Sequence, residues 1–214
     1  MVRNAYATRE RRDAVVREIR SALTACCPGS HSGLRGSLAA GTADEYSDID
    51  LAWMVPDDRF AACLDRVPNV LNDLYPVESV RSDPDFQNSA KRRLLFVLFR
   101  DLPLFWRLDL EIWAASISGN SAHDTDNPAA KGDDWSPAAS ALTNAIAAVK
   151  AVRRRRLDDA RGLVDRAFAR IGADDRVTGD WAADITRLAG AAARREPGLT
   201  SLAGRVRELA AELL

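Results

Sequence analysis

The first half of the chain combines one helical pattern of apolar residues with several short strand-type runs. Residues 7–25 place apolar side chains at helical spacing and predict an amphipathic helix. Short apolar runs predict strands around residues 32–37, 48–55, 77–81, 94–99 and 104–113. The last two runs flank the turn RDLP, which indicates an antiparallel hairpin. Residues 57–74 also look helical, but Pro68 is expected to break that helix because proline removes a backbone donor.

The second half of the chain carries helical patterns only. Ser136 followed by Pro137 is typical of an N-cap with proline at the first helical position. Helices are predicted from this point onward, and over residues 158–171, 179–195 and 199–213. We therefore expect a small helical bundle over residues 136–214.

Between these halves, residues 116–136 are rich in Ser, Gly, Asn, Asp and Pro, a composition typical of loops. We interpret this segment as a linker between a domain over residues 1–120 and the helical domain over residues 136–214. A mobile loop over a binding site is the alternative, because loops of this length are uncommon unless they are functional or disordered. The whole pattern predicts an α+β fold around a small sheet, followed by the helices.

Composition and charge exclude several classes of protein. Of the 214 residues, 47% are apolar and 29% are charged, which is typical of a soluble globular protein. The 30 basic and 31 acidic residues nearly balance, which argues against a dedicated nucleic-acid partner. The N-terminal sequence has no apolar stretch of the kind found in signal peptides or membrane anchors, so we expect a cytoplasmic protein with no membrane partner. The three cysteines lack the spacing of a zinc site.

The candidate chemistry lies in the segment GSLAAGTADEYSDIDLAWMV at residues 36–55. Side chains alternate along a strand, so Asp48 and Asp50 are expected on one face while their apolar neighbours fill the other. Two carboxylates about 7 Å apart on one strand face suit a divalent cation, especially Mg²⁺, which prefers carboxylate and phosphate oxygens. The small residues Gly36 and Ser37 allow the backbone to approach an anion, and the serine hydroxyl can donate to it.

The pair Gly36-Ser37, followed by the DID triplet, resembles the signature of the DNA polymerase β-like nucleotidyltransferase superfamily. The full segment is similar to small bacterial members, among them minimal nucleotidyltransferases and antibiotic nucleotidyltransferases acting on aminoglycosides or lincosamides. The resemblance implies a small mixed β-sheet flanked by helices, in a catalytic domain over residues 1–120, and a helical C-terminal domain that completes the cleft. One departure is Ala40, where many relatives carry arginine.

The family places a third carboxylate on a later strand, and the segment WRLDLEIW at residues 106–113 supplies that element here. The resemblance therefore implies a Mg²⁺ cofactor bound by Asp48, Asp50 and Asp109. Asp109 or Glu111 is expected as the catalytic general base, and Glu111 is preferred if the metal fully occupies Asp109. An ion pair between Glu111 and an arginine, either Arg107 or Arg93, is an alternative of equal weight.

The resemblance also implies a set of nucleotide-binding residues. Gly36 and Ser37 are expected to hold the β and γ phosphates, and Ser47 joins them as part of the same motif. Lys150 is the only lysine on the first C-terminal helix, and relatives often contact the triphosphate with a basic residue of that domain.

These residues imply an enzyme that transfers a nucleoside monophosphate, AMP from ATP, to a hydroxyl of a small molecule with release of pyrophosphate. The helical second domain favours a small-molecule acceptor, such as an antibiotic, because that acceptor needs a second wall to its pocket. One alternative is an antitoxin-type enzyme that AMPylates a partner protein. Another is a nucleotide-binding regulator without turnover. Relatives often form homodimers, but the sequence marks no interface.

Overall fold

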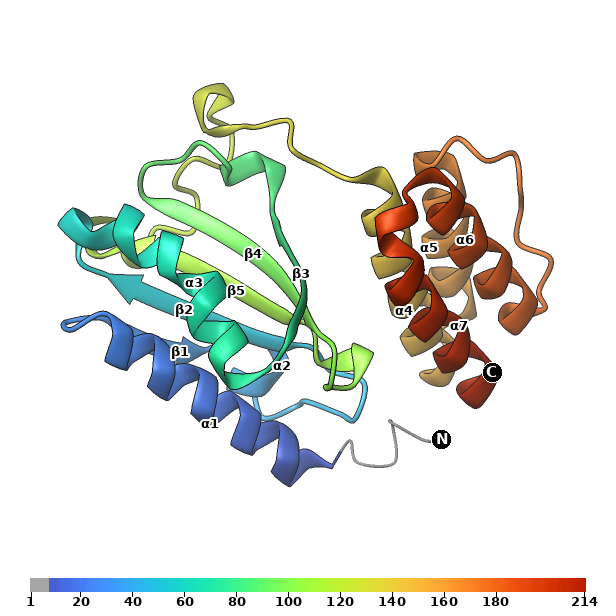
Figure 1. Cartoon of the computed structure of the whole chain (residues 1–214), viewed down its shortest axis with the longest axis horizontal. Helices are drawn as coiled ribbons and strands as arrows, with labels where there is room; N and C mark the ends of the chain where they lie inside the picture. Colours follow the sequence, from blue (N-terminus) through green and yellow to red (C-terminus); the bar gives the residue numbers. More distant parts are fainter. Residues whose placement is uncertain (1–7) are drawn as a thin grey trace. The chain divides into compact units, whose positions relative to one another are not determined.

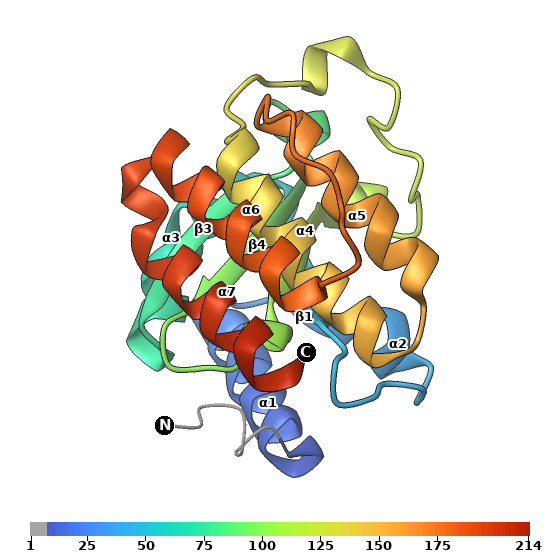
Figure 2. The ribbon, with the colours of Figure 1, turned by 90° about the vertical axis from the view of Figure 1, so that its right-hand side faces the viewer.

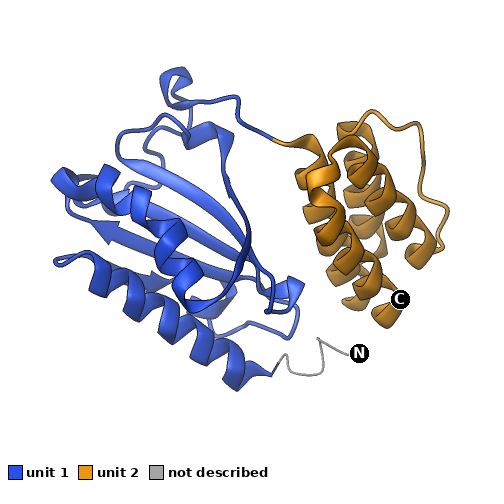
Figure 3. Cartoon of the chain, viewed as in Figure 1, with its two compact units in different colours: residues 1–135 blue, residues 136–214 orange. Residues whose placement is uncertain are grey.

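The computed structural model describes residues 8–214, so residue 7, the expected start of the first helix, lies outside the described residues. The chain divides after Trp135 into two compact units (Figure 3). The first unit is a mixed α and β structure (Figure 1). Its main elements are α1 (Arg9–Cys26), β1 (His31–Leu34), α2 (Gly36–Ala39), β2 (Ile49–Val55), α3 (Phe60–Leu74), β3 (Val77–Ser82), β4 (Arg92–Phe99) and β5 (Leu108–Ala114).

The five strands of the first unit form one mixed sheet in the order β1-β2-β5-β4-β3. The pairing of β2 with β5 is parallel, and the other three pairings are antiparallel. The predicted hairpin of β4 with β5 is confirmed, although Leu104–Trp106 forms a 3₁₀ turn ahead of β5 instead of extending the strand. The last strand in the sequence therefore takes the central place in the sheet.

Alternation along the strands separates an apolar face of the sheet from a polar one. In β2, Ile49, Leu51 and Trp53 are completely buried, while Asp50 between them is partly exposed. Helices α1 and α3 pack against each other, and each also contacts the sheet. The opposite face of the same strands carries Asp50 and, on β5, Asp109.

The expected break at Pro68 is wrong, because α3 runs through this residue without interruption. A buried apolar face stabilises the helix from one side and includes Val67, the residue directly before the proline. Pro68 itself lies on the exposed side, where water can replace the hydrogen bond that proline removes from the helix. Tertiary packing thus outweighs the local cost of the proline.

The segment expected to be a linker is fastened to the first unit, which extends to Trp135 and past the expected boundary at residue 120. The N–H of Asn88 donates to the carbonyl of Ala130 at 2.9 Å. The N–H of Gly132 donates to the carbonyl of Pro84 at 2.8 Å. These bonds tie residues 128–132 to the turn before β4, so this part of the segment is built into the unit.

The second unit starts at Ser136 and contains four helices that lie side by side in Figure 2. They are α4 (Pro137–Arg153), α5 (Leu157–Arg170), α6 (Trp181–Arg195) and α7 (Thr200–Leu213). The predicted N-cap is confirmed, since the Ser136 hydroxyl accepts from the N–H of Ala139 at 2.9 Å. Helix α4 packs against the other three and buries Leu142 and Val149. No helix within residues 8–214 is both long and apolar enough to cross a membrane.

Candidate active site

Asp50 and Asp109 face each other across the parallel pair of strands. They are direct partners in the register of β2 and β5, and strand alternation places both side chains on the polar face. Asp48 stands one residue before β2, so it lies next to this strand and not within it as the sequence predicted. The N–H of Ile49 donates to the carbonyl of Arg107 at 2.9 Å, which aligns the beginnings of the two strands. The fold thus places the three predicted metal ligands near the same end of the pair, although their side chains do not converge on one point.

Arg107 neutralises part of this negative charge. Its Nε and Nη2 donate to the two carboxylate oxygens of Asp109 at 2.5 and 2.6 Å. Burial nevertheless raises the pKa of Asp109 to about 6, because it outweighs the opposing effect of Arg107 and is reinforced by the charges of Asp48 and Asp50. Asp48 and Asp50 thus act electrostatically on Asp109, and Arg107 offsets only part of the effect of burial on its pKa.

The donor set suits a hard divalent cation, which prefers carboxylate oxygens and would relieve the repulsion between them. Within residues 8–214, no three acidic, cysteine or histidine side chains converge closely enough to hold a metal ion. At Asp109 both oxygens are bonded to Arg107. A cation bound by Asp48, Asp50 and Asp109 would therefore share or replace that contact. The residues fit the predicted metal in chemical type.

The raised pKa of Asp109 predicts a pH dependence of stability in the absence of divalent metal. The folded-state pKa, about 6, lies above the ordinary value of 3.8, so the folded protein holds the Asp109 proton more tightly than the unfolded chain. The contribution of this proton to the free energy of unfolding is fully present below the pKa of the unfolded chain. It is lost as the pH rises through the pKa of the folded protein. It amounts to about 3 kcal/mol at most.

Urea unfolding measures this pH dependence of stability. The wild type and Asp109→Asn are compared over about two pH units above the pKa of the unfolded chain. The free energy of unfolding of the wild type, relative to the variant, is expected to fall as the pH rises. A difference that stays constant with pH contradicts the raised pKa.

Gly36 lies directly against the Asp50 carboxylate. A Cβ at this position would overlap the side chain of Asp50, and the backbone of Gly36 has a φ of +53°. Both observations call for glycine, since other residues rarely adopt this conformation. The N–H of Arg35 donates to the carbonyl of Asp50 at 2.9 Å and holds this turn in place. Ser37 follows Gly36 within α2 and is partly exposed.

Replacing Gly36 by alanine is expected to displace the Asp50 side chain. It should reduce about tenfold or more the nucleotidyl transfer that the sequence predicts. Gly41→Ala is the matched control, because Gly41 also has a positive φ, +69°, but has open space where its Cβ would stand. Both variants should lose about 1 kcal/mol of stability from backbone strain, measured by thermal unfolding. Equal activity of the two variants would show that the contact with Asp50 is unimportant.

Ser47 has a role that the sequence did not indicate. Its buried hydroxyl donates to Oδ1 of Asp44 at 2.8 Å and accepts from the N–H of Asp44 at 3.0 Å. A hydroxyl with these two bonds closes the loop that leads into Asp48. The contacts favour a structural role for Ser47 over the nucleotide contact that we expected.

Glu111 is buried and paired with two arginines. Its Oε1 accepts from Nε and Nη2 of Arg92 at 2.9 and 2.7 Å, and its Oε2 is paired with Arg35. The alternative expectation of an ion pair was therefore right in kind, but it named the wrong arginines, Arg107 and Arg93. No local pattern in the sequence indicates these partners, because Arg92 lies on β4 and Arg35 follows β1.

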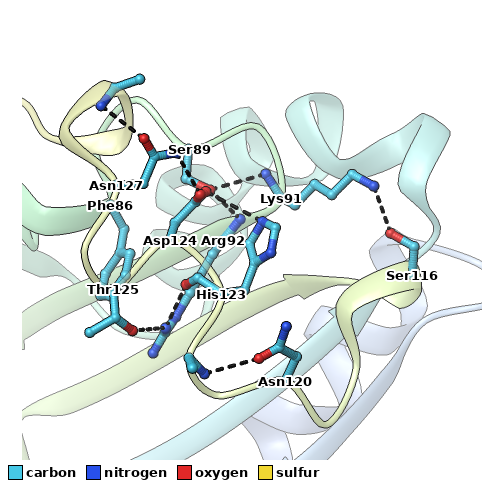
Figure 4. A network of polar contacts seen from close by, with 12 residues as sticks. Phe86, Ser89, Lys91, Arg92, Ser116, Asn120, His123, Asp124, Thr125 and Asn127 are labelled. Atoms are coloured by element: carbon cyan, nitrogen blue, oxygen red, sulfur yellow. Dashed lines mark hydrogen bonds and ion pairs between the residues drawn. The ribbon is translucent and has the colours of Figure 1, made fainter.

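Arg92 also fastens the loop after β5 (Figure 4). Its Nη1 donates to the carbonyls of Ser121 and His123 at 2.8 and 2.9 Å. Its guanidinium lies 4.0 Å from the ring centroid of Phe86. Asp124 completes the network by accepting from the hydroxyl of Ser89 at 2.6 Å. One buried arginine thus joins β4, β5 and the segment after them.

Lys150, the remaining predicted nucleotide-binding residue, lies on α4 of the second unit and is buried. It belongs to a different unit from the three carboxylates.

A scan against protein-family models and a search of curated proteins found no match to this chain.

Proposed function

We propose that this chain is a metal-dependent nucleotidyltransferase that transfers a nucleoside monophosphate, AMP from ATP, to a hydroxyl of a small molecule. One observation carries the proposal most strongly. The turn at Gly36 lies against Asp50, and Asp50 is the direct partner of Asp109 on the neighbouring strand. The motif and the later carboxylate, which are far apart in the sequence, therefore belong to one site. An antibiotic such as an aminoglycoside or a lincosamide is our first candidate for the acceptor.

In the proposed reaction, Asp48, Asp50 and Asp109 hold Mg²⁺, with Gly36 and Ser37 beside the phosphates. The ion supplies neutralisation of phosphate charge and acidification of the attacking hydroxyl. The acceptor oxygen forms a bond to the α-phosphorus while the bond from that phosphorus to the bridging oxygen of pyrophosphate breaks.

A carboxylate oxygen of Asp109 is our preferred acceptor for the hydroxyl proton. Its pKa is about 6 in the absence of metal, and a cation bound beside it would lower that pKa. Glu111 is held by two guanidinium groups, which stabilise its charged form and reduce its basicity. These contacts favour Asp109 over Glu111 as the general base and assign Glu111 to the support of the site.

The test is pyrophosphate release with each of the four nucleoside triphosphates and Mg²⁺, against a panel of antibiotics and sugars. We expect turnover with ATP and one class of acceptor, and its loss in the double variant Asp48→Ala, Asp50→Ala. Full activity of that variant would overturn the proposal. Turnover that requires a co-expressed protein would instead favour an AMPylating antitoxin, and nucleotide binding without turnover would favour a regulator.

A further inference from the structure

Arg35 is the residue between β1 and α2, directly before the Gly-Ser pair of the motif. Its N–H donates to the carbonyl of Asp50 at 2.9 Å, which fixes its backbone beside that carboxylate residue. Its guanidinium is paired with Glu111 and lies 5.2 Å from the ring centroid of Trp113. Both of these residues are on β5, where they alternate with buried apolar residues. Arg35 therefore places a cation on the polar face of the sheet.

Glu111 is shared by two arginines, Arg35 and Arg92. Asp83 and Asp124 also act electrostatically on Arg92. The pKa of Arg92 is lowered from its ordinary value, first by burial and then by the charge of Arg35. The two guanidinium groups are therefore close enough for one charge to lower the pKa of the other.

Arg35 is the more exposed of the two arginines. The Arg92 side chain is only 10% exposed, and its three nitrogens are bonded to Glu111 and to the loop after β5. The Arg35 side chain is 39% exposed. Arg92 therefore keeps Glu111 neutralised whether or not Arg35 takes another partner.

A partly exposed arginine whose backbone is bonded to Asp50 suits a phosphate group that approaches the proposed metal ligands. Arginine presents a planar fork of donors that matches two phosphate oxygens. The ring of Trp113 supports the Arg35 side chain and limits its freedom, so that less entropy is lost when a ligand binds. A carboxylate ligand set and a cation placed next to each other match the two charges of a metal-bound polyphosphate.

We propose that Arg35 binds the triphosphate of the nucleotide substrate, an inference that deepens the proposed function of this site and rests on it. The guanidinium exchanges its contact with Glu111 for phosphate oxygens, and Arg92 retains Glu111 when it does. Arg35 is a binding residue in this scheme, and it takes no part in proton transfer.

Calorimetric titration of the full chain with ATP and Mg²⁺, and separately with inorganic tripolyphosphate and Mg²⁺, tests this role. Arg35→Met is expected to weaken the binding of both probes about tenfold, the effect of losing a charge-assisted hydrogen bond. Arg35→Lys should lose less, because it keeps the charge. Arg17→Met is the matched control, since it removes an exposed arginine from α1 and should bind as the wild type does.

The outcomes separate this inference from the proposed function. Unchanged binding by Arg35→Met, or weakening for ATP alone, overturns the inference and leaves nucleotidyl transfer standing. Binding of tripolyphosphate that depends on Arg35, in a protein without transferase activity, supports the inference and removes the proposed function. A wild type that binds neither probe overturns both. Thermal unfolding should change little in Arg35→Met, whereas a large drop in the melting temperature would indicate a structural role.

Discussion

Replacing Asp50 by asparagine is expected to reduce pyrophosphate release about 100- to 1000-fold, the loss that follows removal of one preorganised charged group from an active site. Asparagine has nearly the same shape as aspartate, so the contact with Gly36 is preserved while the negative charge is lost. Asp50 is also the direct partner of Asp109, so the change removes the charge opposite a second proposed ligand. Steady-state rates at saturating ATP measure the effect.

Asp58→Asn is the matched control for this prediction. Asp58 is exposed in the 3₁₀ turn that follows β2, so its change to asparagine also removes one negative charge close to this strand. We expect the control to retain wild-type activity and both variants to retain the wild-type melting temperature within a few degrees. A surface substitution typically changes a rate by about threefold or less. A rate for Asp50→Asn within that range of the wild type would therefore exclude Asp50 as a metal ligand.

Replacing Arg92 by methionine is expected to lower the free energy of unfolding by about 3 kcal/mol, the lower end of the cost of breaking a buried ion pair. Glu111 keeps Arg35 as a partner, which places the effect at that lower end. The variant also deprives the carbonyls of Ser121 and His123 of their donor. Thermal unfolding should show a fall in melting temperature of roughly 6–12 °C.

The neighbouring cation offers a matched control for Arg92. Lys91 is paired with Asp57 at 3.5 Å, and both side chains are more than 40% exposed. Lys91→Met should therefore cost no more than about 1 kcal/mol. Adding Glu111→Gln to Arg92→Met should cost less than the two single changes together, because it removes the charge that the first change leaves without its main partner. Equal losses in Lys91→Met and Arg92→Met would show that the Arg92 network contributes little to stability.

Local patterns in the sequence predicted the separate elements of the fold better than their pairing. The alternation of Ile49–Val55 identified both the strand and its buried face, since side chains on a strand repeat every two residues. The cap at Ser136 marked the first helix of the second unit. The parallel pairing of β2 with β5 has no local signature, because it joins strands that are separated by α3 and two other strands. Pro68 was misinterpreted because the packing of the opposite helix face is a tertiary effect.

The site shows the same division between local and tertiary information. Alternation placed Asp109 and Glu111 on one strand face, and the register of β5 agrees with it. The partners of Glu111 could not be predicted, because Arg35 and Arg92 reach it from two other parts of the chain. The sequence therefore indicated which acids share a face, but not that one of them would be enclosed by arginines.

The central place of β5 has a consequence for how the site comes into being during folding. Of the strands in residues 8–214, β5 is the last to be synthesised, yet it separates β2 from β4 in the finished sheet. A nascent chain that ends before Leu108 contains Asp48 and Asp50 but cannot complete the ligand set. Contacts between distant segments also form late, because closing the intervening chain costs entropy. A ligand that binds all three carboxylates would therefore stabilise only molecules in which this strand is already inserted. Binding of such a ligand therefore reports that β5 has been inserted and that the sheet is complete.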